Sequence, residues 1–164
     1  MSRATDSLTP DSGSTSTPIT TTQAVNNVAE RFAKASFLAV DTEFMREKTY
    51  YPQLCLIQIS DGTEAVCIDP LAEGLDLSAL WALMRNPAIV KVFHAASQDL
   101  EIFLNLMGNL PVPVYDTQIA AMVIGQGDQV GYDKLVKALL DHDIDKTSRF
   151  TDWSKRPLSE RQIV

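Results

Sequence analysis

The chain is organised around Phe37-Leu38-Ala39-Val40-Asp41-Thr42-Glu43-Phe44, an apolar run that ends in two carboxylates. Residues two positions apart lie on one face of a β-strand, so this run predicts a strand from which Asp41 and Glu43 project together while Thr42 points away. Two adjacent carboxylates repel each other unless a cation lies between them, and carboxylate oxygens suit Mg²⁺ or Mn²⁺. An alternative stays open for these residues alone, in which Asp41 caps a turn and Glu43 is solvated.

The composition is typical of a soluble globular protein. The chain has 164 residues, enough for one domain, and is 45% hydrophobic and 21% charged. No apolar run approaches the roughly 20 residues that span a bilayer, and the N-terminus lacks the pattern of a secretory signal, so we expect a cytoplasmic protein without a membrane partner. Cys55 and Cys67 are too few and wrongly spaced for a structural zinc site, and we expect both to be reduced core residues.

The net charge of −7 is unusual for a protein that binds nucleic acid, because such binding rests on Lys and Arg. Basic side chains gather near the C-terminus, at Lys146, Arg149, Lys155, Arg156 and Arg161. Such a cluster is compatible with a surface that follows a phosphate backbone and equally with an ordinary solvated surface.

Residues 1–22 are rich in Ser and Thr and predict a disordered tail ahead of one domain over residues 23–164. Apolar spacing predicts helices over 23–36, 77–85, 98–107, 117–124 and 132–140, and a strand over 89–93. The apolar runs 54–60 and 63–69 flank Asp61-Gly62 and predict a hairpin with a two-residue turn, in which Cys55 and Cys67 face opposite sides of the sheet. The pattern predicts an α/β fold, a mixed sheet with helices on both faces.

Further candidate site residues follow the strands. Asp99 lies on an apolar helix stripe, where a carboxylate either needs a partner or is stabilised by the helix dipole. His94 lies at the end of the strand before that helix, where it is either a structural histidine, a metal ligand or a residue in contact with substrate. Tyr50 and Tyr51 follow the first strand and offer rings that stack on bases or simply pack.

Five segments in order resemble ribonuclease D, a 3′-5′ exoribonuclease of the DEDD superfamily with a ribonuclease H-like fold: Asp41–Phe44, Thr49–Gln58, Phe93–Leu100, Asp116–Ala121 and Thr151–Gln162. The resemblance covers about residues 19–164 and implies that Asp41, Glu43 and Asp99 are catalytic metal ligands. These would hold two divalent metal ions, Mg²⁺ or Mn²⁺, that hydrolyse phosphodiester bonds. It implies RNA as the partner, with single-stranded 3′ ends and trimming of tRNA precursors as the typical role. The candidate substrate-binding residues are Phe44, His94, Tyr50, Tyr51 and Arg46.

The family's third motif, Tyr-x-x-x-Asp, would begin just beyond Val164. We therefore expect a truncated catalytic domain with weak activity or none, and a non-catalytic RNA-binding or interaction fragment of the same fold stays open as the alternative. Ser159 and Gln162 match a capping box and predict a helix that begins at Ser159.

Overall fold

The structure is a computed structural model that describes residues 17–47, 49–145 and 151–163. Its elements in chain order are α1 (Thr22–Phe32), β1 (Phe37–Met45), β2 (Gln53–Ser60), β3 (Ala65–Ile68), α2 (Ser78–Arg85), β4 (Val90–Phe93), α3 (Ser97–Met107), β5 (Val114–Asp116), α4 (Thr117–Val123), α5 (Tyr132–Leu140) and α6 (Glu160–Ile163). The predicted helices are all present in this order, although the first ends at Phe32 rather than near residue 36.

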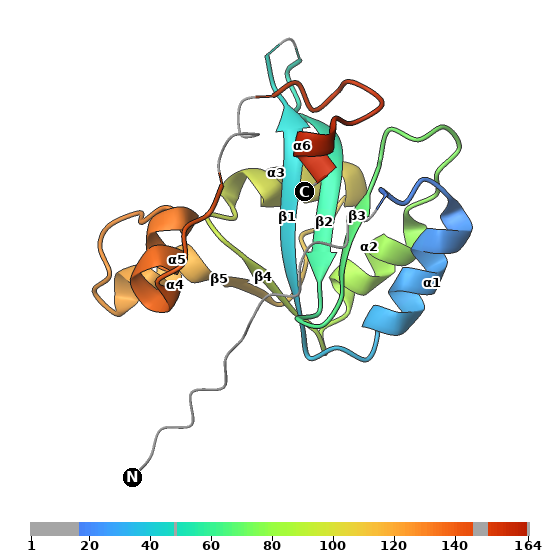
Figure 1. Cartoon of the computed structure of the whole chain (residues 1–164). Helices are drawn as coiled ribbons and strands as arrows, with labels where there is room; N and C mark the ends of the chain where they lie inside the picture. Colours follow the sequence, from blue (N-terminus) through green and yellow to red (C-terminus); the bar gives the residue numbers. More distant parts are fainter. Residues whose placement is uncertain (1–16, 48, 146–150, 164) are drawn as a thin grey trace.

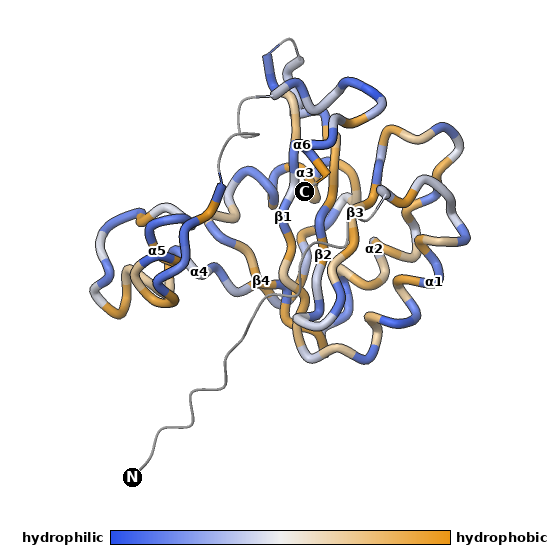
Figure 2. Tube along the Cα trace, viewed as in Figure 1, coloured by the Kyte–Doolittle hydropathy of each residue, from blue (hydrophilic) through white to orange (hydrophobic). Residues whose placement is uncertain are grey.

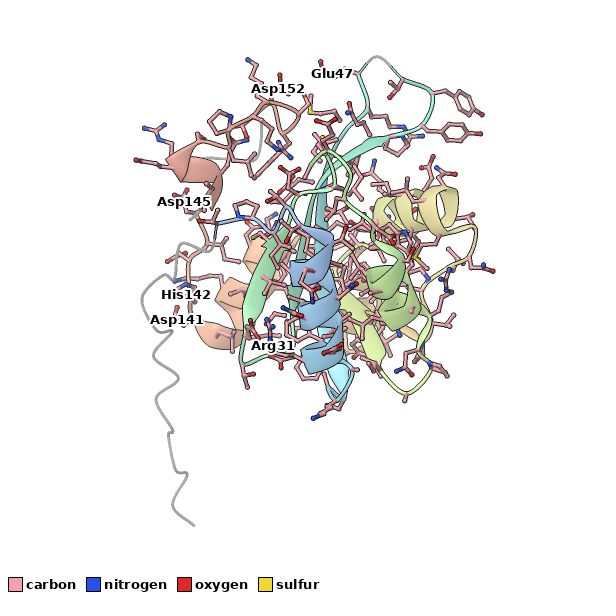
Figure 3. The ribbon with its side chains drawn as sticks, turned by 90° about the vertical axis from the view of Figure 1, so that its right-hand side faces the viewer. Arg31, Glu47, Asp141, His142, Asp145 and Asp152 are labelled. Carbon is pink, nitrogen blue, oxygen red and sulfur yellow. The ribbon has the colours of Figure 1, made fainter. Side chains whose placement is uncertain are left out.

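The five strands form one mixed sheet in the order β3-β2-β1-β4-β5, with β1 at its centre. β1 pairs antiparallel with β2 and parallel with β4, which in turn pairs parallel with β5. In Figures 1 and 3, α2 and α3 lie on one side of this sheet and α5 and α6 on the other. The predicted α/β fold with helices on both faces is confirmed.

The core lies on the side of the sheet that α1, α2 and α3 cover. Val25, Val28 and Phe32 recur at helical spacing on α1 and are buried in the hydrophobic core, where α1 packs against α2. β1 alternates as a strand should, with Leu38 and Val40 buried in the same core. Figure 2 shows the apolar residues along the strands and on these helices. The other face of β1, which carries Asp41, remains open.

The hairpin differs from its prediction in turn and register. A four-residue turn, residues 61–64, joins β2 to β3, and Ser60 pairs with Ala65 rather than Thr63. The Asp61 carboxylate accepts hydrogen bonds from the Thr63 and Glu64 amides, both at 2.8 Å. The predicted two-residue turn is wrong because this side chain satisfies the amides of a longer turn.

Cys55 and Cys67 form no disulfide, as predicted, and Cys55 is buried. They contact the same hydrophobic cluster, so the prediction that they face opposite sides of the sheet is wrong. The pairing of β1 with β2 is irregular here: Glu43 pairs with Leu56 and the next residue of β1 pairs with Leu54, which leaves Cys55 as an extra residue. Such a bulge interrupts the alternation of side chains that the prediction assumed.

The fold begins before residue 22. The Ile19 amide donates to the Cys67 carbonyl at 2.8 Å, and the Asp69 amide donates to the Ile19 carbonyl at 2.9 Å, so Ile19 forms a parallel bridge beside β3. The Thr21 side chain then caps α1. The predicted tail is therefore too long at its C-terminal end, because an apolar residue pairs with the sheet edge; residues 1–16 lie outside the described part of the chain.

Candidate active site

Three carboxylates meet at the edge of the sheet where the parallel neighbours β1 and β4 end. Asp41 and Glu43 lie in the second half of β1, and Asp99 lies in the first turn of α3, directly after β4. Because β4 is the parallel neighbour of β1, the start of α3 lies beside the end of β1. In an α/β sheet the site lies beyond the strand ends, so the order of strands and helices in the sequence also predicts this convergence.

Thr42 supplies the contact that joins the two elements. Its side chain is buried, and its hydroxyl donates to the Asp99 carboxylate at 2.5 Å. Asp99 therefore has the partner that a carboxylate on an apolar stripe needs. The strand pattern correctly predicted that Thr42 lies on the face away from Asp41, but it gave no sign that Thr42 contacts Asp99.

The electrostatics of the three carboxylates are coupled. Burial raises the pKa of Glu43 to about 7, and the charges of Asp41 and Asp99 add to this shift. Burial also raises the pKa of Asp99 to about 6, against the lowering effect of the Thr42 hydrogen bond. The pKa of Asp41 is raised by partial loss of hydration, although its side chain lies on the open face. All three carboxylates are thus destabilised as anions, which a cation would relieve.

The donor set fits a hard divalent cation by its chemistry, since all ligand atoms are carboxylate oxygens. In the part of the chain that the structure describes, no group of three or more His, Cys, Asp or Glu side chains forms an assembled metal site. The assignment of Asp41, Glu43 and Asp99 as ligands therefore stays a prediction.

A hollow of about 550 Å³ opens beside Asp41, on the face of β1 that carries this residue. His94 lines it, but both ring nitrogens have partners within the protein: Nδ1 lies 2.9 Å from the Thr117 hydroxyl and Nε2 lies 2.9 Å from the Val130 carbonyl oxygen. The ring also lies 5.5 Å from that of Tyr132. These contacts match the structural reading of His94, and contact with substrate stays a prediction.

The connection from β1 to β2 carries the exposed aromatic residues. Tyr50 is 85% exposed and Tyr51 60%, with their rings edge to face at 4.9 Å. The Arg46 guanidinium forms two hydrogen bonds to Glu101, at 2.9 and 3.0 Å, whereas Phe44 packs against the core. The tyrosine rings are thus accessible for stacking. Figure 3 shows Glu47 of this connection at the same end of the molecule as Asp152.

The predicted basic surface is only partly described, because Lys146 and Arg149 fall outside the described residues. Arg156 is not available for phosphate. Its guanidinium donates to the Asp69 carboxylate at 2.6 and 2.7 Å and to the Cys55 carbonyl at 2.6 Å. Of the two alternatives left open for the basic cluster, neither a phosphate contact nor a solvated side chain describes Arg156, because an acidic partner 87 positions earlier holds its charge.

Comparison with known proteins agrees with this geometry. The family model of the 3′-5′ exonuclease matches residues 16–164. Ribonuclease D of Gluconacetobacter diazotrophicus is 57% identical over 146 residues, which cover 89% of this chain and 37% of that protein. Ribonuclease D of Acidiphilium cryptum shows the same identity and coverage. The chain thus spans little more than a third of the length of these relatives.

Solved structures show the same likeness. The crystal structure of Escherichia coli RNase D matches with a TM-score of 0.85 and 44% identity, over 90% of this chain and 39% of that one. Brucella melitensis NrnC with bound Mg²⁺ matches with a TM-score of 0.69 and 30% identity, over 79% of this chain and 64% of that one. The predicted resemblance to ribonuclease D is confirmed. The chain therefore belongs to the 3′-5′ exonuclease family and is similar to its ribonuclease D members.

Proposed function

We propose that this chain is the catalytic core of a metal-dependent 3′-5′ exoribonuclease. The observation that carries the proposal is the meeting of Asp41, Glu43 and Asp99 at one edge of the sheet, where burial raises the pKa of each and repulsion from neighbouring carboxylates further raises those of Glu43 and Asp99. Such a group of acids is stable as anions only with a cation nearby.

The residues have separate roles in this proposal. Asp41, Glu43 and Asp99 would hold two divalent cations. When bound, such ions activate a water molecule and stabilise the leaving oxygen of a phosphodiester. Thr42 orients Asp99 through its hydroxyl, and the exposed rings of Tyr50 and Tyr51 would stack on bases near the 3′ end.

The proposed substrate is the single-stranded 3′ end of RNA, with tRNA precursors as the natural case. Two features support RNA: the identity with ribonuclease D proteins, and the Escherichia coli relative, which is described as an exoribonuclease involved in structured RNA processing. The described residues contain no helix long and apolar enough to cross a membrane.

The test is shortening of a 5′-labelled RNA by an excess of the chain, so that slow hydrolysis is still detected. With Mn²⁺ or Mg²⁺ we expect a ladder that shortens from the 3′ end, and none with a 3′-phosphate block, with chelator, or with Asp41→Ala. Shortening that persists in Asp41→Ala would refute the assignment of the site. RNA binding without any metal-dependent shortening would favour the non-catalytic alternative.

A further inference from the structure

The turn that leads into the Asp99 helix has an unusual backbone. Ala95 has a φ of 58°, a left-handed conformation that alanine rarely adopts. α3 begins directly after Ala96, and no side-chain hydrogen bond caps it at that position. The helix start therefore depends on support from elsewhere in the chain.

Asp116, at the end of β5, gives this support. One carboxylate oxygen accepts the Ala95 amide at 3.1 Å and the other accepts the Ala96 amide at 2.9 Å. The same carboxylate accepts the Gln118 amide at 2.8 Å, so it also caps α4. Burial acts to raise the pKa of Asp116, but these amides together hold it below its ordinary value, so the group stays ionised. An anion at the start of α3 is also favoured by the helix dipole.

Thr117 strengthens the same junction. Its hydroxyl lies 2.9 Å from the Phe93 carbonyl, to which it donates, and 2.9 Å from the Nδ1 atom of His94. Asp116 and Thr117 together therefore contact each residue from Phe93 to Ala96. Neither residue belongs to the set of Asp41, Glu43 and Asp99, so no catalytic role is assigned to either.

We propose that Asp116 is a positioning residue, which fixes the left-handed turn at Ala95 and thereby places Asp99 against Thr42 at the metal-binding edge. The step to metal binding rests on the proposed function. The step to the helix start does not, because the hydrogen bonds of Asp116 end on the turn itself. Asp116 thus acts on the site through α3, without contact with substrate.

The test is Asp116→Asn in the full chain, with two readouts. The first is amide hydrogen exchange at Leu100, whose amide bonds to the Ala96 carbonyl in the first turn of α3, compared with Gly108 at the other end of the helix. Replacing the charged carboxylate with a neutral amide weakens its hydrogen bonds to the turn, so hydrogen exchange at the Leu100 amide should be about tenfold faster. Exchange at the Gly108 amide should not change. The second is Mn²⁺ affinity by calorimetry, which should fall about tenfold.

Asp61→Asn is the matched control, since Asp61 also accepts backbone amides through its carboxylate but lies in the hairpin turn. It should change neither readout. Adding Ala95→Gly to Asp116→Asn should restore most of the Mn²⁺ affinity, because glycine adopts a positive φ without support. If Asp116→Asn does not fold, Thr117→Ala probes the same junction and should change both readouts in the same direction.

Unchanged exchange at Leu100 would overturn the proposal. So would faster exchange at Leu100 with Mn²⁺ affinity equal to that of the unmodified chain. If the unmodified chain binds no Mn²⁺ while Asp116→Asn still speeds exchange at Leu100, the proposed function fails but the positioning of the helix start is supported.

Discussion

Arg156→Ala should destabilise the whole domain, because it leaves a buried carboxylate without its positively charged partner. Asp69 is only 6% exposed and receives two hydrogen bonds from Arg156, at 2.6 and 2.7 Å. Removing one partner of a buried ion pair costs about 3 to 5 kcal/mol. The Arg156 side chain is 26% exposed, so water can enter and hydrate Asp69 after the substitution. We therefore expect a loss near the lower end, about 3 kcal/mol in the free energy of unfolding.

The assay is urea unfolding followed by circular dichroism, with Arg31→Ala as the control. Arg31 also forms two hydrogen bonds to one carboxylate, that of Glu64, but both side chains are largely exposed, so its loss should be much smaller. Equal losses in the two variants would refute the reasoning. The double variant Arg156→Ala with Asp69→Asn should lose less than the sum of the single changes.

The pair also has a predicted pH dependence. Burial acts to raise the pKa of Asp69, but Arg156 and the Leu71 amide hold it below its ordinary value of 3.8. The stability from this carboxylate is therefore present above pH 4 and is lost as the pH falls through the lowered value. The difference between the unmodified chain and Arg156→Ala should shrink in acid.

Three further predictions concern other sites. Asp41→Ala should abolish Mn²⁺ binding in a calorimetric titration whereas Asp99→Asn should only weaken it, and unchanged binding in Asp41→Ala would remove Asp41 from the site. Lys91 is fully buried, and burial lowers its pKa to about 8 from 10.5, so the free energy of unfolding should rise between pH 8 and 10.5, where the unfolded chain binds the extra proton. In urea unfolding, Lys91→Met should not show this rise with pH. An equal rise in the variant and in the unmodified chain would contradict the prediction. Replacing Tyr50 and Tyr51 with Ala should weaken single-stranded RNA binding about tenfold or more without changing stability, because both rings are exposed; unchanged affinity in a fluorescence titration would exclude stacking.

The parts of the fold predicted from sequence are those that local patterns determine. The first strand alternates regularly between exposed and buried residues from Phe37 to Thr42, and the helix with Asp99 ends at Gly108, which adopts the left-handed conformation expected of a terminating glycine. The order of these elements also predicted that the acids converge, since parallel neighbours end at the same edge of a sheet.

The parts that were missed depend on single side chains that contact distant residues. Thr42 binds Asp99 across 57 positions, and Arg156 binds the Cys55 carbonyl across 101. Neither contact produces a periodic pattern in the sequence. A charged residue near the C-terminus also looks the same in the sequence whether its side chain is solvated or paired. The hairpin turn was missed for a related reason, since the carboxylate of Asp61 outweighed the preference of Asp-Gly for a short turn.

The ion pair of Asp69 and Arg156 has a consequence for synthesis of the chain. Asp69 leaves the ribosome 87 residues before Arg156, a delay of roughly 4 to 17 s at ordinary rates of translation. During that interval Arg156 has not been made, so its guanidinium cannot neutralise Asp69, which lies next to β3 and the Ile19 bridge. Because burial of this carboxylate is costly without its ion-pair partner, we expect β3 to be fully stabilised only after the segment that carries Arg156 has been made.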